Sequence, residues 1–103
     1  MSNAAPAAYL FCRGLYALNV TLPTPLVEYT GGLREVNASG ETLDDLLHDL
    51  DRQYPGIQFR MIDEQGNIRA HIKLFVNAEL ERSLGAPLAT QDVVIIVAAL
   101  SGG

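Results

Sequence analysis

The sequence has few of the residues on which enzymes, metal sites and disulfide-rich proteins depend. Among 103 residues it contains one cysteine (Cys12), two histidines, no tryptophan and seven lysine or arginine residues. A single cysteine cannot form an internal disulfide, so no oxidising compartment is implied and we expect a cytoplasmic protein. The excess of 12 acidic over 7 basic residues gives a net charge of -5, which disfavours a nucleic-acid partner.

Long hydrophobic runs are also missing. No stretch approaches the roughly 20 apolar residues of a membrane-spanning helix, so we expect no membrane partner. The length suffices for one domain with a modest core. We expect a flexible arm over residues 1–13, whose first residues are either native or a tag remnant, and one folded domain over 14–103, a monomer when alone.

The residues that could carry chemistry are scattered. Cys12 lies in or beside the arm, with no base predicted near it. His48 is expected on the solvent face of a helix and His71 on an exposed strand, too far apart for a metal site. Residues 63–67 lack the ligand alternation of a calcium loop, and neither Gly-Gly pair has the spacing of a phosphate loop. We therefore expect no catalytic residue, no metal and no bound cofactor.

The first half of the chain predicts two strands and a helix. Apolar residues alternate over 16–22, a pattern typical of a half-buried strand, and Pro23 and Pro25 end it. A loop to residue 32 and a second strand over 33–38 complete an antiparallel pair. Thr42 then caps a helix that Pro55-Gly56 stops. Its apolar face comprises Leu43, Leu46, Leu47, Leu50 and Tyr54, and its solvent face Asp44, Asp45, His48, Asp49 and Arg52.

The second half predicts a turn and two more strands. Residues 57–62 fit either a short strand or an irregular segment, and 63–67 form a turn. Alternation over 68–77 predicts a long strand, and 77–90 are mostly connection. Residues 93–100 are almost all apolar, which indicates a central strand covered on both faces. The fold class is therefore α+β, with one main helix packed across a mixed sheet of four to five strands.

The last four residues, Leu100-Ser101-Gly102-Gly103, follow directly on this strand. Glycine has no Cβ, so a carboxylate carried by two glycines can enter a narrow site. Such a carboxylate reacts with nucleophiles only after one oxygen becomes a leaving group, which adenylation by ATP on a partner enzyme would achieve. A frayed end without function is the alternative interpretation.

Several segments together resemble the ubiquitin-like bacterial sulfur carriers. They are the strand end Phe75-Val76-Asn77, the stretch from Pro87-Leu88 to Asp92-Val93-Val94-Ile95, and the terminal Ser101-Gly102-Gly103. The family includes the small subunit of molybdopterin synthase, the thiamine sulfur carrier and the actinobacterial carrier for cysteine synthesis. The likeness is greatest to the last, through Asn19-Val20-Thr21, Thr30-Gly31-Gly32 and Val36 to Leu43.

The resemblance implies a beta-grasp fold and a defined chemical role. Gly103 would be adenylated by an activating enzyme that uses ATP, and then converted to a thiocarboxylate. Leu100, Ser101 and Gly102 would be inserted with it into the partner's active site. A cysteine synthase or another sulfur-accepting enzyme would receive the sulfur, and a metalloprotease would trim the added cysteine. The chain would be a substrate of enzymes and no enzyme itself.

Other interpretations remain open at this point. The sulfur could serve molybdopterin or thiamine synthesis, or Gly103 could form isopeptide bonds as a ubiquitin-like modifier, with Lys73 the only lysine for chains. The domain could also be a plain interaction module. An apolar patch around Phe75 and Val97 is a possible docking surface, or ordinary strand packing. Ala98-Ala99 stand where many relatives have proline, which implies a less stiff tail.

Overall fold

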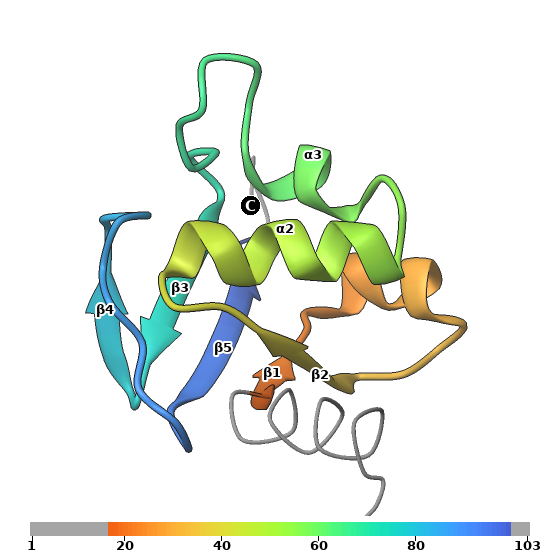
Figure 1. Ribbon diagram of the computed structural model, residues 1–103. Coiled ribbons are helices and arrows are strands. Elements are labelled where there is room, and N and C mark those ends of the chain that lie inside the picture. The colour runs from red at the N-terminus through yellow and green to blue at the C-terminus, as the bar shows by residue number, and fades with distance from the viewer. Residues whose placement is uncertain (1–16, 100–103) are drawn as a thin grey trace, which may run out of the picture.

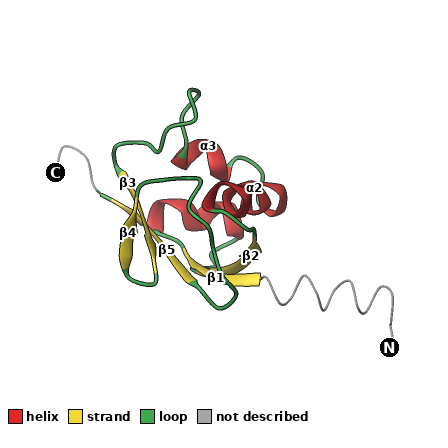
Figure 2. Cartoon of the chain, turned by 60° about the vertical axis from the view of Figure 1, so that its left-hand side comes forward, coloured by secondary structure: helices red, strands yellow, loops and turns green. Residues whose placement is uncertain are grey.

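The computed structural model describes residues 17–99, which form a five-stranded sheet with the helices packed on one face (Figures 1 and 2). The predicted arm at 1–13 and the tail at 100–103 lie outside the described residues. The elements in chain order are β1 (Ala17–Thr21), the 3-10 helix η1 (Thr24–Thr30), β2 (Glu35–Ser39), α2 (Leu43–Gln53), α3 (Ile57–Met61), β3 (Ile72–Val76), β4 (Glu79–Glu81) and β5 (Val93–Ala98).

The sheet is mixed, as predicted, and its strand order is β2-β1-β5-β3-β4. β5 pairs in parallel with β1 and antiparallel with β3, while β2 and β4 form the two edges. The helix α2 lies across the sheet (Figure 1). The predicted α+β class, the central place of the last strand and the single main helix are confirmed.

The core lies between α2 and the inner face of the sheet. β1 directs Leu18 and Val20 inward, with Leu22 following, as its alternation predicted. α2 buries four leucines completely, namely Leu43, Leu46, Leu47 and Leu50. Burial of one such side chain contributes about 2 kcal/mol, so this face holds the helix to the sheet. The predicted cap is also present, because the Thr42 hydroxyl accepts a hydrogen bond of 3.2 Å from the Asp45 amide.

The assignment of Asp49 to the solvent face of the helix was wrong. Asp49 is only 6% exposed, and its carboxylate accepts hydrogen bonds from the Ser39 amide and the Gln53 amide group, each at 3.0 Å. Arg52 forms an ion pair with it. Position 49 borders the leucine face, and the end of β2 covers it there. Asp49 thus ties α2 to β2.

The segment predicted as a loop over 26–32 is instead the 3-10 helix η1 with its C-terminal turn. Pro25 stands in the first turn, where a fixed φ and a missing amide hydrogen suit a helix start. Leu26 and Thr30 are buried, and the Thr30 hydroxyl bonds to the carbonyls of Val27 and Leu33. The second strand consequently begins at Glu35, two residues later than predicted.

The stretch 57–77 also departs from the prediction. Residues 57–61 form the short helix α3, which buries Ile57 and Met61. The long strand predicted from 68 reduces to β3, because Ile68 makes only an isolated bridge with Ile62. His71 therefore lies in the turn before β3 instead of on a strand. The connection expected over 77–90 includes the edge strand β4.

Gly40 sets the closest approach between the sheet and the helix. A Cβ built at this position would lie 2.8 Å from the carbonyl carbon of Asp45 and would collide with the backbone nitrogen of Leu46. The φ angle of Gly40 is not in the left-handed region, so space alone requires glycine here. The crossing from β2 to the first turn of α2 depends on this absence of a side chain.

We predict that Gly40→Ala lowers the free energy of unfolding by about 2–3 kcal/mol, because helix backbone must move to admit the methyl group. Urea denaturation followed by circular dichroism measures this change. The matched control is Gly85→Ala, where the nearest atom to a new Cβ is the Ser83 Oγ at 3.7 Å. It should alter stability by less than about 0.5 kcal/mol. Equal stability of the two variants would contradict the role of Gly40.

Candidate functional site

The tail begins at a tightly held point of the sheet. β5 ends at Ala98, and the amide of Ala99 donates a hydrogen bond of 2.8 Å to the carbonyl of His71. The last described residue is thus joined to the turn before β3. The residues predicted to react or to enter a partner, Gly103 with Leu100, Ser101 and Gly102, lie beyond it and outside the described residues. The structure places Ala99, the residue from which the tail continues, and we call Ala99 the tail root.

The other end of β5 is secured by Asn77 and Asp92. The Asn77 amide group donates to the Asp92 carboxylate at 2.8 Å, and its side-chain oxygen accepts from the Val93 amide at 2.9 Å. The second Asp92 oxygen accepts from the Ala89 amide at 2.8 Å. Asn77 has φ of +52°, in the left-handed region that asparagine tolerates better than most residues. These bonds fix the β3–β4 turn against the start of β5.

The outer face of the sheet is apolar around β5. Strand register places Phe75 opposite Ile95 and Lys73 opposite Val97, so Phe75 and Val97 share one face as diagonal neighbours. Leu80 lies opposite Phe75 on the other side. We call this set the outer patch; it consists of Phe75, Leu80, Val93, Ile95 and Val97.

The prediction that β5 is covered on both faces was wrong. Val93 is 40% exposed, Val97 39% and Leu80 42%, because every helix within residues 17–99 packs on the opposite face. The run of apolar residues therefore covers two surfaces, with Val94 and Ile96 in the core and their neighbours outside. An exposed apolar surface beside a tail root is suited to contact with another protein.

A groove of about 770 Å³ opens on the helix side of the tail root. Its walls are η1, α3, the segment from Arg69 to Ile72, and Ala98 with Ala99. Ala98 faces this groove, whereas Val97 faces the outer patch, since successive strand residues point to opposite faces. The tail therefore starts between an apolar surface and a groove.

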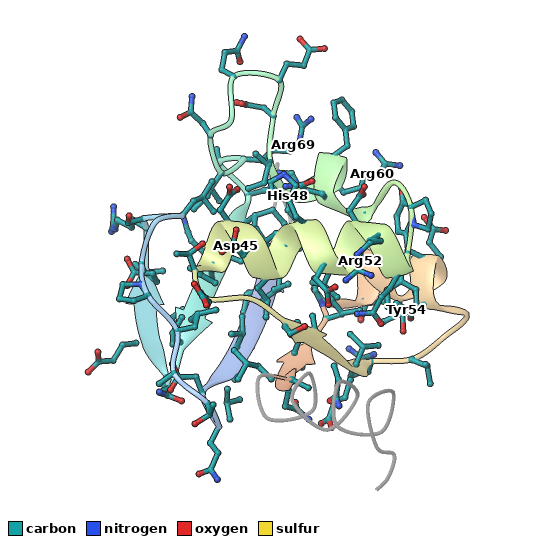
Figure 3. The ribbon with its side chains drawn as sticks, viewed as in Figure 1. Asp45, His48, Arg52, Tyr54, Arg60 and Arg69 are labelled. Atoms are coloured by element: carbon teal, nitrogen blue, oxygen red, sulfur yellow. The ribbon has the colours of Figure 1, made fainter. Side chains whose placement is uncertain are left out.

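Two arginines of this groove are held in place through one nitrogen each. The Arg60 Nε donates to the Tyr29 hydroxyl at 2.6 Å, and the Arg69 Nε donates to the Phe59 carbonyl at 2.8 Å. The Arg69 guanidinium also lies 4.7 Å from the centre of the Phe59 ring. The hydrogen bond to Tyr29, with a smaller contribution from Glu28, raises the pKa of Arg60. Figure 3 shows both arginines beside α3.

The remaining titratable residues that the structure describes are dispersed over the surface. Within residues 17–99 no cluster of three metal-binding side chains exists. His48 is exposed and its Nδ1 lies 2.9 Å from the Asp44 carbonyl, while His71 lines the groove 23 positions further along the chain. Cys12 lies outside the described residues. Across the described part of the chain, no helix is long and apolar enough to cross a membrane.

The sequence prediction missed the groove entirely. Arg60 comes from α3, whose residues the sequence assigned to either a short strand or an irregular segment. Arg69 comes from the turn that the alternation over 68–77 wrongly included in a long strand. One signal was present, because the chain has only seven basic residues and three of them lie at or beside the groove. Arg60 and Arg69 line it, and Arg34 donates a hydrogen bond of 3.3 Å to the lining residue Thr24. Spacing alone could not show that they converge.

Comparisons with known proteins agree with this architecture. The sequence model of the ThiS family matches residues 20–103. The sulfur carrier protein CysO of Mycobacterium tuberculosis is 36% identical over 91 residues, which cover 84% of this chain and 98% of that protein. The CysO of Mycobacterium bovis matches with the same values.

Solved structures show the same fold. The crystal structure of Mycobacterium tuberculosis CysO has a TM-score of 0.77 and 35% identity, and covers 81% of this chain and 99% of that one. CysO in the Amycolatopsis orientalis BexX/CysO complex gives 0.77 and 31%, with 84% and 100% covered. SAMP1 from Haloferax volcanii gives 0.73 and 27%, with 84% and 99% covered. The predicted ubiquitin-like beta-grasp fold is thereby confirmed.

Proposed function

Because the chain belongs to the ThiS family, we propose that it is a sulfur carrier whose Gly103 carboxylate is adenylated and converted to a thiocarboxylate. The observation that carries this proposal is the match to CysO over nearly all of that protein, combined with a tail that starts from the centre of the sheet. The chain then acts as the substrate of partner enzymes, and the ATP belongs to the activating enzyme.

The chemistry takes place at one carboxylate group. A Gly103 carboxylate oxygen attacks the α-phosphate of ATP, which forms the acyl-adenylate and releases pyrophosphate. Hydrosulfide (HS⁻) supplied by a donor then attacks the acyl carbon and displaces AMP, and loss of a proton leaves a thiocarboxylate. Both attacks need open space around the acyl group, which glycines at 102 and 103 provide.

The sheet fixes the point from which the reacting tail starts. β5 is hydrogen-bonded on both sides, and Ala99 is joined to His71, so the tail starts from a fixed point. A partner that binds the body therefore also fixes the region in which the carboxylate can lie. Such restriction raises the effective concentration of the reacting group in the partner's site.

Cysteine synthesis is the destination we propose for the sulfur, since the most similar sulfur carriers reported above are CysO proteins. The thiocarboxylate sulfur would attack an activated serine derivative on a cysteine synthase. Rearrangement of the thioester to an amide would leave cysteine attached to Gly103, and a metalloprotease would release it. The molybdopterin and thiamine routes are alternative destinations.

A protein modifier is the second candidate function. It is favoured by the likeness to SAMP1 from Haloferax volcanii. SAMP1 stands for small archaeal modifier protein 1, the full name given with the solution structure of SAMP1 from Methanosarcina acetivorans. In that case the activated Gly103 would be attacked by a lysine amine on a target protein. The sole lysine of this chain, Lys73, lies exposed on the outer face of β3. The two functions share adenylation and differ in the attacking nucleophile.

We further propose that the outer patch is a docking surface for the activating enzyme. It adjoins the tail root on one side and contains the exposed apolar residues Val93 and Val97. Burial of such a patch would orient the body while the tail enters the active site.

Mass spectrometry of the protein purified from its own host separates the candidate functions. For a sulfur carrier we expect a fraction of the chain with a mass gain equal to exchange of one oxygen for sulfur, localised to Gly103. Lysine conjugates through Gly103 would support the modifier. An unaltered terminus in cells limited for sulfur would contradict both.

Extension of the chain by one alanine after Gly103 should abolish adenylation, because the carboxylate is displaced from the position where the partner holds it. The assay is ATP–pyrophosphate exchange by the host's activating enzyme. Thermal unfolding should be unchanged, since the last buried core residue that the structure describes along the chain is Ile96, well before the addition. An extension at the amino terminus serves as the control and should remain active. Full activity of the alanine-extended form would rule out Gly103 as the reacting group.

Val97→Glu should raise the KM of this chain in the same assay about tenfold, since it places a charge in the apolar contact at the end nearest the tail. The variant should still fold, because Val97 is exposed and Lys73 lies opposite it. Gln65→Glu adds the same charge in the turn at 63–67 and should leave the KM unchanged. If Val97→Glu behaves like this control, the outer patch does not dock.

A further inference from the structure

We propose that the groove beside the tail root, which we call the arginine groove, binds an acidic segment of the adenylating enzyme through Arg60 and Arg69. The inference rests on the proposed sulfur-carrier function and adds a second docking surface to it. The ligand chemistry is a pair of side-chain carboxylates on a partner loop.

Charge complementarity selects this occupant. The whole chain carries 12 acidic and 7 basic residues, yet Arg60 and Arg69 both line this groove, and Arg34 adjoins it through its bond to Thr24. Among the lining residues that the structure describes, Glu28 is the only acidic one. A groove with more positive charge than the surface around it attracts carboxylates and repels other basic segments.

The two guanidinium groups are organised before anything binds. Arg60 is anchored through its Nε to Tyr29, and Arg69 through its Nε to the Phe59 carbonyl. The terminal nitrogens Nη1 and Nη2 of both arginines make no hydrogen bond within residues 17–99. Such a pair matches the two oxygens of a carboxylate. Because the side chains are already held, binding costs less conformational entropy than it would for a free arginine.

Phe59 adds an apolar component to this surface. Phe59 is 56% exposed, although the Arg69 guanidinium lies 4.7 Å from the centre of its ring. An exposed aromatic ring under a fixed cation offers area to the apolar part of an acidic loop. A small anion such as free phosphate would gain nothing from this ring, which favours a peptide segment.

The short reach of the tail brings the partner close to the groove. Four residues follow Ala99, and an extended chain spans at most about 3.5 Å per residue, or about 14 Å in all. An active site that holds the Gly103 carboxylate must therefore lie within this distance of Ala99, which itself lines the groove. A partner that engages the tail is therefore brought close to this part of the body.

The test measures the KM and kcat of the host's adenylating enzyme for this chain by ATP–pyrophosphate exchange over a range of salt concentrations. The variants are Arg60→Gln and Arg69→Gln, singly and together, and Arg82→Gln is the matched control, an exposed arginine outside the groove. We expect the double variant to raise the KM about tenfold with an unchanged kcat, and to weaken its salt dependence. Arg82→Gln should match the wild type.

The other outcomes each overturn the proposal. An unchanged KM in the double variant removes the groove from the interface while the sulfur-carrier function stands. A raised KM with undiminished salt dependence indicates a structural effect, and a raised KM for ATP instead of the chain makes the nucleotide phosphates the ligand. Shifts of the Arg60 and Arg69 Nε–H NMR signals on deletion of residues 100–103 would make the chain's own tail the occupant. No exchange with the wild-type chain would overturn the carrier function and this inference together.

Discussion

β5 forms hydrogen bonds with two strands at once, in parallel register with β1 and in antiparallel register with β3. A strand in this position cannot shift without breaking ladders on both sides. Asn77 and Asp92 hold its start, and the bond from Ala99 to His71 holds its end. The point from which the last four residues extend is therefore constrained in position and direction, and both proposed docking surfaces are defined relative to it.

Alternation along β5 divides the region around the tail root into two surfaces of different character. Val97 contributes to an apolar face, and Ala98 lines a groove that carries two fixed arginines. Apolar burial provides affinity without direction, whereas paired charges restrict which partner fits and in which orientation. In the proposed function one carboxylate is presented to several enzymes, and a small carrier of this kind would gain from both surfaces. An acidic chain with a local basic groove can also be attracted to one face of a partner before contact.

The features predicted correctly are those that local chemistry dictates. The leucine spacing of α2, its Thr42 cap and its stop at Pro55-Gly56 depend only on neighbouring residues, and the structure has all three. Alternation over β1 likewise gave the correct inner face. Failures occurred where a partner element decides the outcome. Asp49 resembled a solvent residue because nothing in the helix itself shows that Ser39 covers it. The apolar run of β5 indicated cover on both faces, although helices pack on only one.

Much about this protein was determined by the sequence alone: the α+β class, the main helix, the central last strand, and the terminal Gly-Gly on which the proposed chemistry rests. Only the tertiary structure decided what surrounds the root of the tail. Arg60 and Arg69 are nine positions apart, on α3 and in the segment before β3, and they converge because both segments line the groove that also borders the end of β5. Gly40 likewise shows its importance only where the helix backbone approaches it. Periodicity reports which side of an element is buried, but contact between distant segments arises from packing, which local pattern does not encode.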